Sequence, residues 1–145
     1  MDRDLTTPRI VVAAAPTEAD RAAILAGLAA FNRGLADPGV VGPLAVLIQD
    51  GDGATIGGLW GRTLFRWLHI ELVFVPPDLR GAARGRVLVR EAEAVAAESG
   101  CIGAFLETYS FQARGFYEKL GYRLVGSIED CPPGVARHIL QKRFA

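Results

Sequence analysis

The sequence predicts an α/β fold in which helices cover the faces of a sheet. Apolar segments with the two-residue period of strands alternate along the chain with segments that have the 3.6-residue period of helices. Clusters of glycine, proline and aspartate separate these segments. Half of the 145 residues are hydrophobic, which suffices for a core at this length, so we expect a single domain over residues 1–145.

The first two elements are expected to be a strand and a helix. Residues 8–14 form a short apolar run that favours a strand, and residues 16–34 have helical periodicity. Thr17 is placed to cap the helix, Asp20 takes the acidic position of a capping box, and Gly34 is expected to end it. The apolar stripe of this helix consists of Ile24, Leu25, Leu28, Phe31 and Leu35.

Three strands are expected next. Residues 44–49 and 54–61 are separated by the segment Asp-Gly-Asp-Gly at positions 50–53, which is a strong hairpin signal. Residues 65–75 form the longest strand. Uninterrupted alternation would place Trp67, His69, Glu71, Val73 and Val75 on one face, and Leu68, Ile70, Leu72 and Phe74 on the other.

The second half of the chain continues the alternation of helices and strands. A helix is expected to run to about Ser99 and to end at Gly100. A second, short helix is expected to be capped by Ser110 and ended by Gly121. Strands are expected over residues 101–109, 122–128 and 136–144. The predicted order is therefore β-α-β-β-β-α-β-α-β-β, which suits a sheet with helices on its faces.

Composition and charge argue against several classes of partner. The formal net charge is zero, so nothing global indicates nucleic acid. The N-terminus lacks the apolar stretch of a signal peptide, and no apolar run reaches membrane-spanning length. Cys101 and Cys131 have no metal-type spacing, so we expect two free thiols in a cytoplasmic protein and no metal site.

The turn before the third expected helix has the features of an anion site. Residues 76–86 provide no serine, threonine or asparagine immediately before the helix, so its first amides are uncapped. Small residues alternate with arginines, which lie at the unfavourable end of the helix dipole. A phosphate or pyrophosphate fits such a turn, although a surface turn with solvated arginines is the alternative. The glycine spacing is neither that of a P-loop nor that of a dinucleotide fingerprint.

The order of elements, the turn RGAARG and the later segment FYEKLGY together resemble the GNAT acyl-CoA N-acyltransferase family over nearly the whole chain. The resemblance implies a mixed, mostly antiparallel sheet that is flanked by helices and opens between its fourth and fifth strands. In that family, an Arg/Gln-x-x-Gly-x-Gly/Ala turn binds the pyrophosphate of coenzyme A. Here Arg80 and Gly85 match its ends, and Ala83 replaces the middle glycine. The cofactor-binding turn so implied comprises Arg80, Gly81, Ala82, Ala83, Arg84, Gly85 and Arg86.

A second family signature, Asn-x-x-Ala followed by a tyrosine-bearing helix, matches Ala113, Phe116 and Tyr117. Ser110 stands where the asparagine usually is. By resemblance, Ser110, Ala113 and Phe116 contact the cofactor, and Tyr117 protonates the departing thiolate. The alternative for Tyr117 is a core aromatic. The resemblance also implies that the thioester carbonyl lies near the backbone amides of Val73, Phe74 and Val75, which would polarise it.

The reaction also needs a base, because an amine is protonated at neutral pH. Glu71 is the candidate, since a carboxylate within an apolar strand is costly unless it is paired or used, and burial would make it more basic. The alternatives are that Glu71 pairs with an arginine, or that His69 is the base or orients the amine. Glu107 is a second candidate substrate carboxylate. The candidate substrate-binding residues are Trp67, His69, Glu107 and Tyr109, although Trp67 is also a core candidate.

The sequence therefore predicts an N-acetyltransferase that moves an acetyl group from acetyl-CoA to a primary amine by direct attack, and releases coenzyme A. The alternative is a non-catalytic acyl-CoA or nucleotide-binding regulatory module, which would keep the anion turn without Glu71 or Tyr117. The identity of the acceptor amine stays open. The closing strands are apolar and alternating, so we also expect a homodimer.

Overall fold

The computed structural model describes residues 7–81 and 83–145. The chain divides into two compact units, Met1–Ala36 and Asp37–Ala145. Within the described residues, no helix combines the length and the apolar character that a membrane crossing requires.

The described residues of the first unit contain one helix, α1, over Glu18–Asn32. The predicted capping box is confirmed: the amide of Asp20 donates to Oγ1 of Thr17 at 3.1 Å, and the amide of Thr17 donates to Oδ2 of Asp20 at 2.9 Å. The hydrogen bonds from Thr17 lower the pKa of the Asp20 carboxyl. Gly34 has φ +83° and follows the helix, as expected.

The strand predicted over residues 8–14 is absent, and this prediction was wrong. That segment has no strand assignment, and Ile10 and Val12 are almost fully exposed. A β-rich sequence becomes a strand only when a neighbouring strand supplies hydrogen-bond partners, and none of the described residues does so here.

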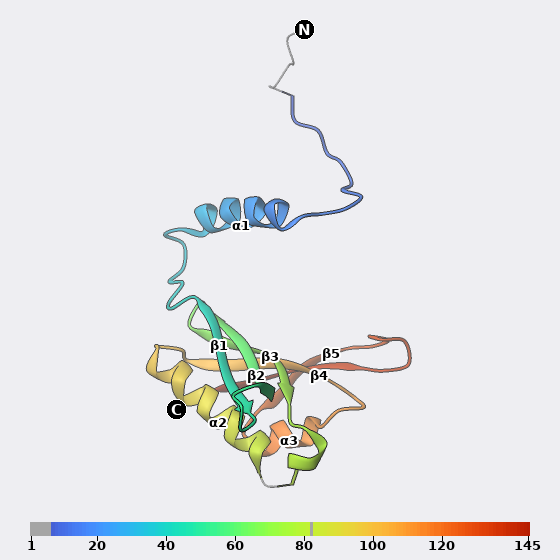
Figure 1. Ribbon diagram of the computed structural model, residues 1–145. Helices are drawn as coiled ribbons and strands as arrows, with labels where there is room; N and C mark the ends of the chain where they lie inside the picture. Colours follow the sequence, from blue (N-terminus) through green and yellow to red (C-terminus); the bar gives the residue numbers. More distant parts are fainter. Residues whose placement is uncertain (1–6, 82) are drawn as a thin grey trace. The chain divides into compact units, whose positions relative to one another are not determined.

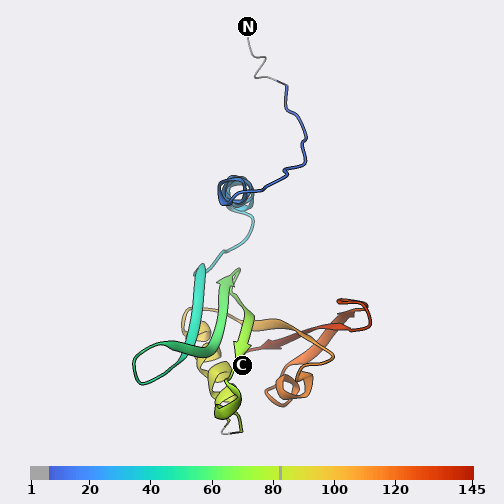
Figure 2. The same ribbon diagram turned by 45° about the vertical axis from the view of Figure 1, so that its right-hand side comes forward.

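The described residues of the second unit form a six-stranded sheet, two helices and one 3₁₀ turn. Figures 1 and 2 show their arrangement. The strand order is β1-β2-β3-β4-β6-β5, and every neighbouring pair is antiparallel except β3 with β4. This confirms the predicted mixed, mostly antiparallel sheet. The strands are β1 Gly42–Gln49, β2 Thr55–Leu64, β3 Trp67–Phe74, β4 Gly103–Tyr109, β5 Arg123–Ile128 and β6 Arg137–Arg143.

The predicted hairpin joins β1 to β2. Oδ1 of Asp50 accepts from the amides of Asp52 at 2.9 Å and Ala54 at 3.0 Å, and Gly53 adopts φ +84°. The aspartate therefore replaces backbone partners within the turn, while glycine takes the left-handed conformation that other residues disfavour.

The two helices of this unit are α2, Arg84–Glu98, and α3, Arg114–Lys119, and the 3₁₀ turn is η1, Pro77–Leu79. The predicted ends at Gly100 and Gly121 are confirmed by their positive φ values of +96° and +99°.

The predicted cap at Ser110 was wrong, because α3 begins later and its N-cap residue is Ala113. Oγ of Ser110 instead accepts from the amide of Ala136 at 3.2 Å, and the amide of Ser110 donates to the Ala136 carbonyl at 3.0 Å. Ser110 therefore ties the segment after β4 to the segment before β6.

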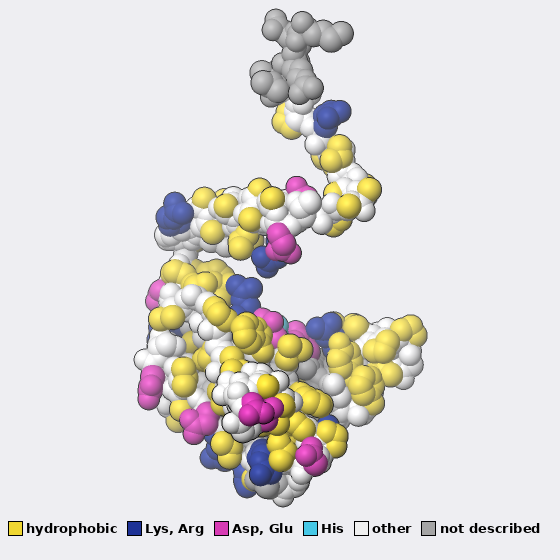
Figure 3. All heavy atoms as spheres, viewed as in Figure 1, with side chains coloured by type: hydrophobic (Ala, Val, Ile, Leu, Met, Phe, Trp, Pro, Cys, Tyr) yellow, Lys and Arg dark blue, Asp and Glu magenta, His cyan; other side chains and the backbone are white. Residues whose placement is uncertain are grey.

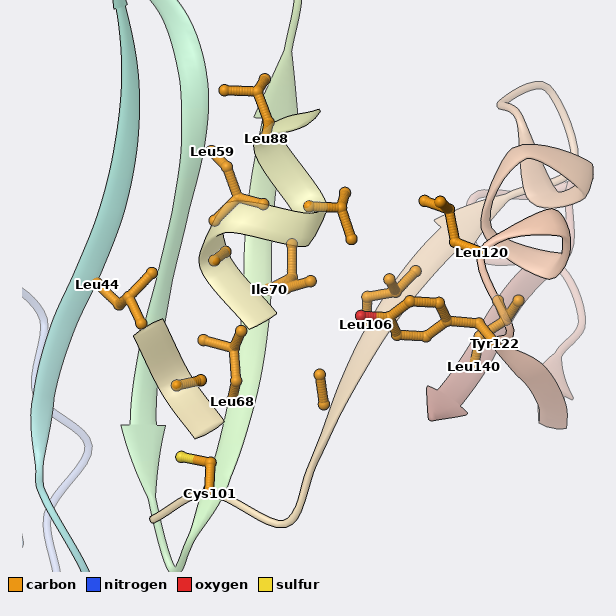
Figure 4. Packing of buried hydrophobic residues seen from close by; sticks show 14 residues of the cluster. Leu44, Leu59, Leu68, Ile70, Leu88, Cys101, Leu106, Leu120, Tyr122 and Leu140 are labelled. Carbon is orange, nitrogen blue, oxygen red and sulfur yellow. The ribbon is translucent and has the colours of Figure 1, made fainter. Parts of the chain in front are cut away.

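The core of the second unit lies between one face of the sheet and the helices (Figure 4). Leu68 and Ala104 from adjacent strands are fully buried, as are Val89 and Ala92 of α2. The buried cluster consists of Leu44, Leu59, Leu68, Ile70, Leu88, Val89, Ala92, Ala96, Cys101, Ala104, Leu106, Leu120, Tyr122 and Leu140.

A buried polar group interrupts this core. Glu93 of α2 accepts from the Tyr122 hydroxyl at 2.9 Å and from Nζ of Lys142 at 2.9 Å. Burial and the charge of Glu93 raise the pKa of Tyr122, so its phenol remains a donor. The three side chains thus join α2 to both β6 and the segment after α3.

The sheet opens where β3 and β4 part. These parallel strands pair only from Trp67 with Gly103 to Ile70 with Leu106, although β3 continues to Phe74 and β4 to Tyr109. The predicted opening between the fourth and fifth expected strands is therefore present. In the structure these are the third and fourth strands, because the first expected strand is absent.

Candidate active site

A cleft of about 830 Å³ occupies the opening between β3 and β4. The start of α2 and the residues of α3 complete its wall. Most of the residues predicted from the sequence meet here: Glu71, Val73, Phe74, Val75, Arg80, Gly81, Ala83, Arg84, Gly85, Arg86, Glu107, Tyr109, Ala113, Phe116 and Tyr117. Ala82 lies outside the described residues. Trp67, His69 and Ser110 are not part of the lining.

The turn before α2 presents uncapped amides to the cleft. Its N-cap residue is Ala83, and no side chain of the described residues caps the helix. The first amides of an α-helix have no intrahelical acceptor, so they are available to an anion. Ala83 adopts φ +59°, which costs an L-residue about 1–2 kcal/mol. The turn therefore keeps the geometry of a glycine-rich loop even where alanine replaces glycine.

Two of the predicted arginines stabilise the turn itself. Nε of Arg80 donates to the carbonyl of Val75, and a guanidinium nitrogen of Arg84 donates to the carbonyl of Leu79, each at 2.8 Å. The Arg80 guanidinium also lies over the Phe74 ring, 5.9 Å from its centroid. These contacts connect η1 to the segment after β3 and to the start of α2, and both arginines line the cleft.

Gly85 allows α3 to approach the start of α2. A Cβ atom at this position would lie 3.2 Å from Cζ of Phe116, which is tight. The absence of a side chain therefore lets the Phe116 ring form part of the cleft wall next to the uncapped amides.

A β-bulge in β3 positions Glu71. Trp60 of β2 pairs with Leu72, whereas its neighbour Gly61 pairs with Ile70, so Glu71 has no partner residue on β2. The bulge breaks the strict alternation expected for this strand. Val73 and Val75 consequently pack on the core side with Ile70, not on the face of Glu71 as predicted. Leu72 and Phe74 are exposed whereas Leu68 and Ile70 are buried, so the prediction that these four residues share one face was wrong as well.

The same bulge leaves Glu71 exposed, so the expectation that it is buried was also wrong. Glu71 lines the cleft, and it forms no ion pair with the described residues. The alternative that Glu71 pairs with an arginine is therefore not seen in this part of the chain. Its carboxylate is free to accept a proton or to bind a cation.

The β4 side of the end of β3 has no strand partner. Pairing with β2 continues to Phe74, whereas pairing with β4 stops at Ile70. In an antiparallel pair, alternate residues direct their backbone groups away from the partner strand. Some backbone groups at the end of β3 therefore face the cleft.

Tyr117 lies on α3 and contributes to the cleft wall. Its ring contacts Phe116 edge-on at a centroid distance of 5.0 Å and Tyr122 at 6.0 Å. Burial raises the pKa of the Tyr117 phenol, which therefore keeps its proton throughout the neutral range. The Tyr117 ring therefore packs against the edge of the hydrophobic core. Because Tyr117 also lines the cleft, its position is compatible with a proton donor.

His69 is held away from the cleft lining by two contacts. Its Nε2 atom lies 2.9 Å from Oε2 of Glu107, and its ring stacks on Phe105 with centroids 4.4 Å apart. Arg137 also approaches the other Glu107 oxygen, at 3.8 Å. Trp67 contacts the same Phe105 ring, with centroids 6.5 Å apart. Of the four predicted substrate residues, Glu107 and Tyr109 line the cleft.

Five lining residues were not singled out from the sequence: Ile70, Leu72, Leu106, Thr108 and Gln112. Oε1 of Gln112 accepts from the amide of Tyr109 and from Oγ1 of Thr108, both at 3.1 Å, and so fixes the turn after β4. Alternation along β4 could have identified Leu106 and Thr108. The position of Gln112 depends on a side-chain contact that has no periodic signal.

The uncapped helix start in this cleft is suited to bind the phosphates of an anionic acyl carrier. The unpaired carboxylate of Glu71 is suited to interact with an amine that receives the acyl group. Comparison with known proteins identifies the class. The model of the acetyltransferase (GNAT) family matches residues 17–122. The chain belongs to this family, and it is an acetyltransferase that transfers an acetyl group from acetyl-CoA to an amine. The alternative of a non-catalytic binding module is not retained.

Individual relatives support this assignment. The chain is 50% identical over 93 residues to blasticidin-S acetyltransferase of Streptomyces morookaense. The aligned region covers 63% of this chain and 68% of that protein. An acetyltransferase structure from Bacillus cereus has a TM-score of 0.79 at 29% identity and covers 92% of this chain and 98% of that one. An aminoglycoside 6′-N-acetyltransferase complexed with coenzyme A has the same fold, with a TM-score of 0.59 at 19% identity, covering 70% of this chain and 72% of that one.

Proposed function

We propose that the acetyl group moves by direct attack of the acceptor amine in the β3–β4 cleft, with Glu71 as base and Tyr117 as acid. The amine nitrogen bonds to the thioester carbonyl carbon, and the carbon–sulfur bond breaks. The ammonium form of the acceptor loses one proton to Glu71, directly or through water, before the attack. The nitrogen loses a second proton as the amide forms, while Tyr117 gives its proton to the coenzyme A sulfur and regains one from the nitrogen through solvent. The observation that carries the proposal is that one cleft contains the uncapped turn, Glu71 and Tyr117.

The position of Glu71 supports its role as base. The bulge directs it into the cleft without a partner among the described residues, whereas Nε2 of His69 is engaged by Glu107. Because Glu71 is exposed to solvent, we favour proton transfer through a water molecule that Glu71 orients. Glu107 stays a candidate substrate contact, since it also lines the cleft.

The cofactor is proposed to lie along the predicted turn. The pyrophosphate would accept hydrogen bonds from the first amides of α2, next to Gly85. The pantetheine arm would then pass Ala113 and Phe116 towards the gap between the strands. Backbone amides at Val73 to Val75 would polarise the thioester carbonyl. Developing negative charge on that oxygen makes such donors more effective in the transition state than in the ground state.

We propose that the acceptor is the primary amine of an antibiotic related to blasticidin S. The relative named blasticidin-S acetyltransferase supports this class, since half of the residues are identical over the aligned region. The test is a free-thiol assay with acetyl-CoA and a panel containing blasticidin S, polyamines and lysine peptides. Release of coenzyme A with blasticidin S is the expected result. Turnover restricted to polyamines or peptides would reject the antibiotic assignment.

We further propose one catalytic domain over residues 1–145, a cytoplasmic location and a homodimer. Both cysteines are free, which suits a reducing compartment. Strand β5 forms one edge of the sheet, and Val125 and Ile128 on it are exposed. Figure 3 shows hydrophobic side chains gathered at the end of the β5–β6 hairpin. An apolar edge of this kind favours pairing with a second copy.

A further inference from the structure

A second, smaller hollow of about 250 Å³ lies beside the start of α2. Three of the residues that line it, Ala83, Arg86 and Phe116, also line the large cleft. The two spaces therefore meet at the uncapped turn. A ligand bound at the turn therefore lies next to the hollow. The hollow is lined by Ala83, Arg86, Arg90, Phe116, Lys119 and Leu120.

Three cations surround this hollow. Arg86 and Arg90 are four residues apart on α2, so their side chains are neighbours on the helix surface. A pair of like charges at this spacing destabilises a helix slightly. Lys119 joins them from the last turn of α3. None of the three forms an ion pair with the described residues, although other basic side chains nearby do, such as Arg114 with Glu118. The whole chain has zero formal net charge, so three cations without ion-pair partners give this hollow a local positive potential. Such a potential favours the binding of an anionic ligand.

The chemistry of the hollow differs from that of the turn. Backbone amides at a helix start suit the singly charged oxygens of a pyrophosphate diester. Three side-chain cations suit a phosphate monoester, which carries nearly two negative charges above its second pKa of about 6. Phe116 and Leu120 add an apolar surface that a ribose or an aromatic base can contact. Coenzyme A carries such a monoester on its ribose, next to the pyrophosphate.

We propose that this hollow binds the 3′-phosphate of the coenzyme A ribose, and that Arg90 and Lys119 make the protein select acetyl-CoA over acetyl-3′-dephospho-CoA. The inference rests on the proposed placement of the pyrophosphate at the turn before α2. Arg86 lines both spaces and lies between the two anionic groups. Arg90 and Lys119 line the hollow but not the cleft, so substitutions at these two positions test the hollow without changing the lining of the cleft.

The test is a calorimetric titration of acetyl-CoA and of acetyl-3′-dephospho-CoA, which requires no acceptor. The wild-type protein should bind acetyl-CoA about 10- to 100-fold more tightly, because one or two charge-assisted contacts are lost without the 3′-phosphate. Arg90→Gln combined with Lys119→Gln should remove this preference by weakening acetyl-CoA alone. Arg123→Gln is the control, because Arg123 is exposed on β5 and lines neither space.

Equal affinity of the wild-type protein for the two donors would overturn the inference while leaving the proposed cofactor site intact. Retention of the full preference by the double variant, with its melting temperature unchanged, would do the same. Failure of both donors to bind would instead overturn the proposed function, and this inference with it. The preference should also shrink as ionic strength rises, because exposed cations are screened. A preference independent of salt would contradict recognition by Arg90 and Lys119.

Discussion

Nε2 of His69 lies 2.9 Å from Oε2 of Glu107, and the pair links β3 to β4 at the point where the strands begin to separate. Glu71, two residues beyond His69, has no corresponding partner among the described residues and faces the cleft. Two candidate bases on one strand therefore differ in their availability. The histidine nitrogen is engaged within the sheet, whereas the Glu71 carboxylate lines the cleft without an ion-pair partner among the described residues.

The turn before α2 gives the first prediction. Gly85→Glu should weaken acetyl-CoA binding severely, because it adds bulk and negative charge next to the uncapped amides. Gly115→Glu is the matched control, since a side chain at that position of α3 meets open space. Calorimetry of both variants is the measurement. Normal affinity in the Gly85 variant would show that the cofactor lies elsewhere.

Tyr117→Phe tests the proposed acid. The substitution removes one hydroxyl, so kcat should fall about 10²- to 10⁴-fold while the affinity for coenzyme A changes little. Because burial raises the pKa of Tyr117 above its ordinary value, the wild-type phenol stays protonated at neutral pH. Any loss of rate from its ionisation should therefore appear only above about pH 10. An unchanged kcat, with chemistry limiting turnover, would leave Tyr117 as a core aromatic.

The buried carboxylate of Glu93 gives a prediction about stability. Glu93→Ala should lower the free energy of unfolding by about 3 kcal/mol, since Lys142 and Tyr122 lose their partner within the core. Glu118→Ala removes a carboxylate from an exposed pair with Arg114 and should cost about 0.5 kcal/mol or less. Urea unfolding of the two variants compares them directly. Equal, small losses would mean that the Glu93 group does not stabilise the core.

The exposed edge at β5 predicts self-association. Multi-angle light scattering at micromolar concentration should give a particle of twice the 15.5 kDa chain mass. Val125→Lys should shift it towards the monomer, because a charge on an edge strand opposes pairing. Ala54→Lys, in the exposed turn between β1 and β2, serves as a control for added charge. A wild-type particle of one chain mass would reject the dimer.

Much of the second unit was predictable from the sequence because its signals are local. The hairpin at positions 50–53 and the helix ends at Gly100 and Gly121 depend on turn chemistry that a few adjacent residues determine. The uncapped start of α2 was also visible, since missing caps and small residues can be read directly. The resemblance to a family then connected this turn to coenzyme A.

The errors arose where long-range partners decide the structure. Residues 8–14 have the composition of a strand but no ladder partner among the described residues. The bulge at Glu71 depends on pairing with β2, so simple alternation placed Val73 and Val75 on the wrong face. Ser110 resembles a cap locally, yet its hydroxyl binds the distant Ala136 amide.

The role of Glu71 is tested most directly by the pH dependence of kcat/KM in Glu71→Gln, with His69→Gln as the comparison. If Glu71 is the base, the wild-type profile has an acidic limb that reports its ionisation in the free enzyme. Glu71→Gln keeps the side-chain shape but removes the charge, so it should lower the rate and flatten that limb, while His69→Gln should retain it. A limb that survives in Glu71→Gln and disappears in His69→Gln would contradict the account and make His69 the base.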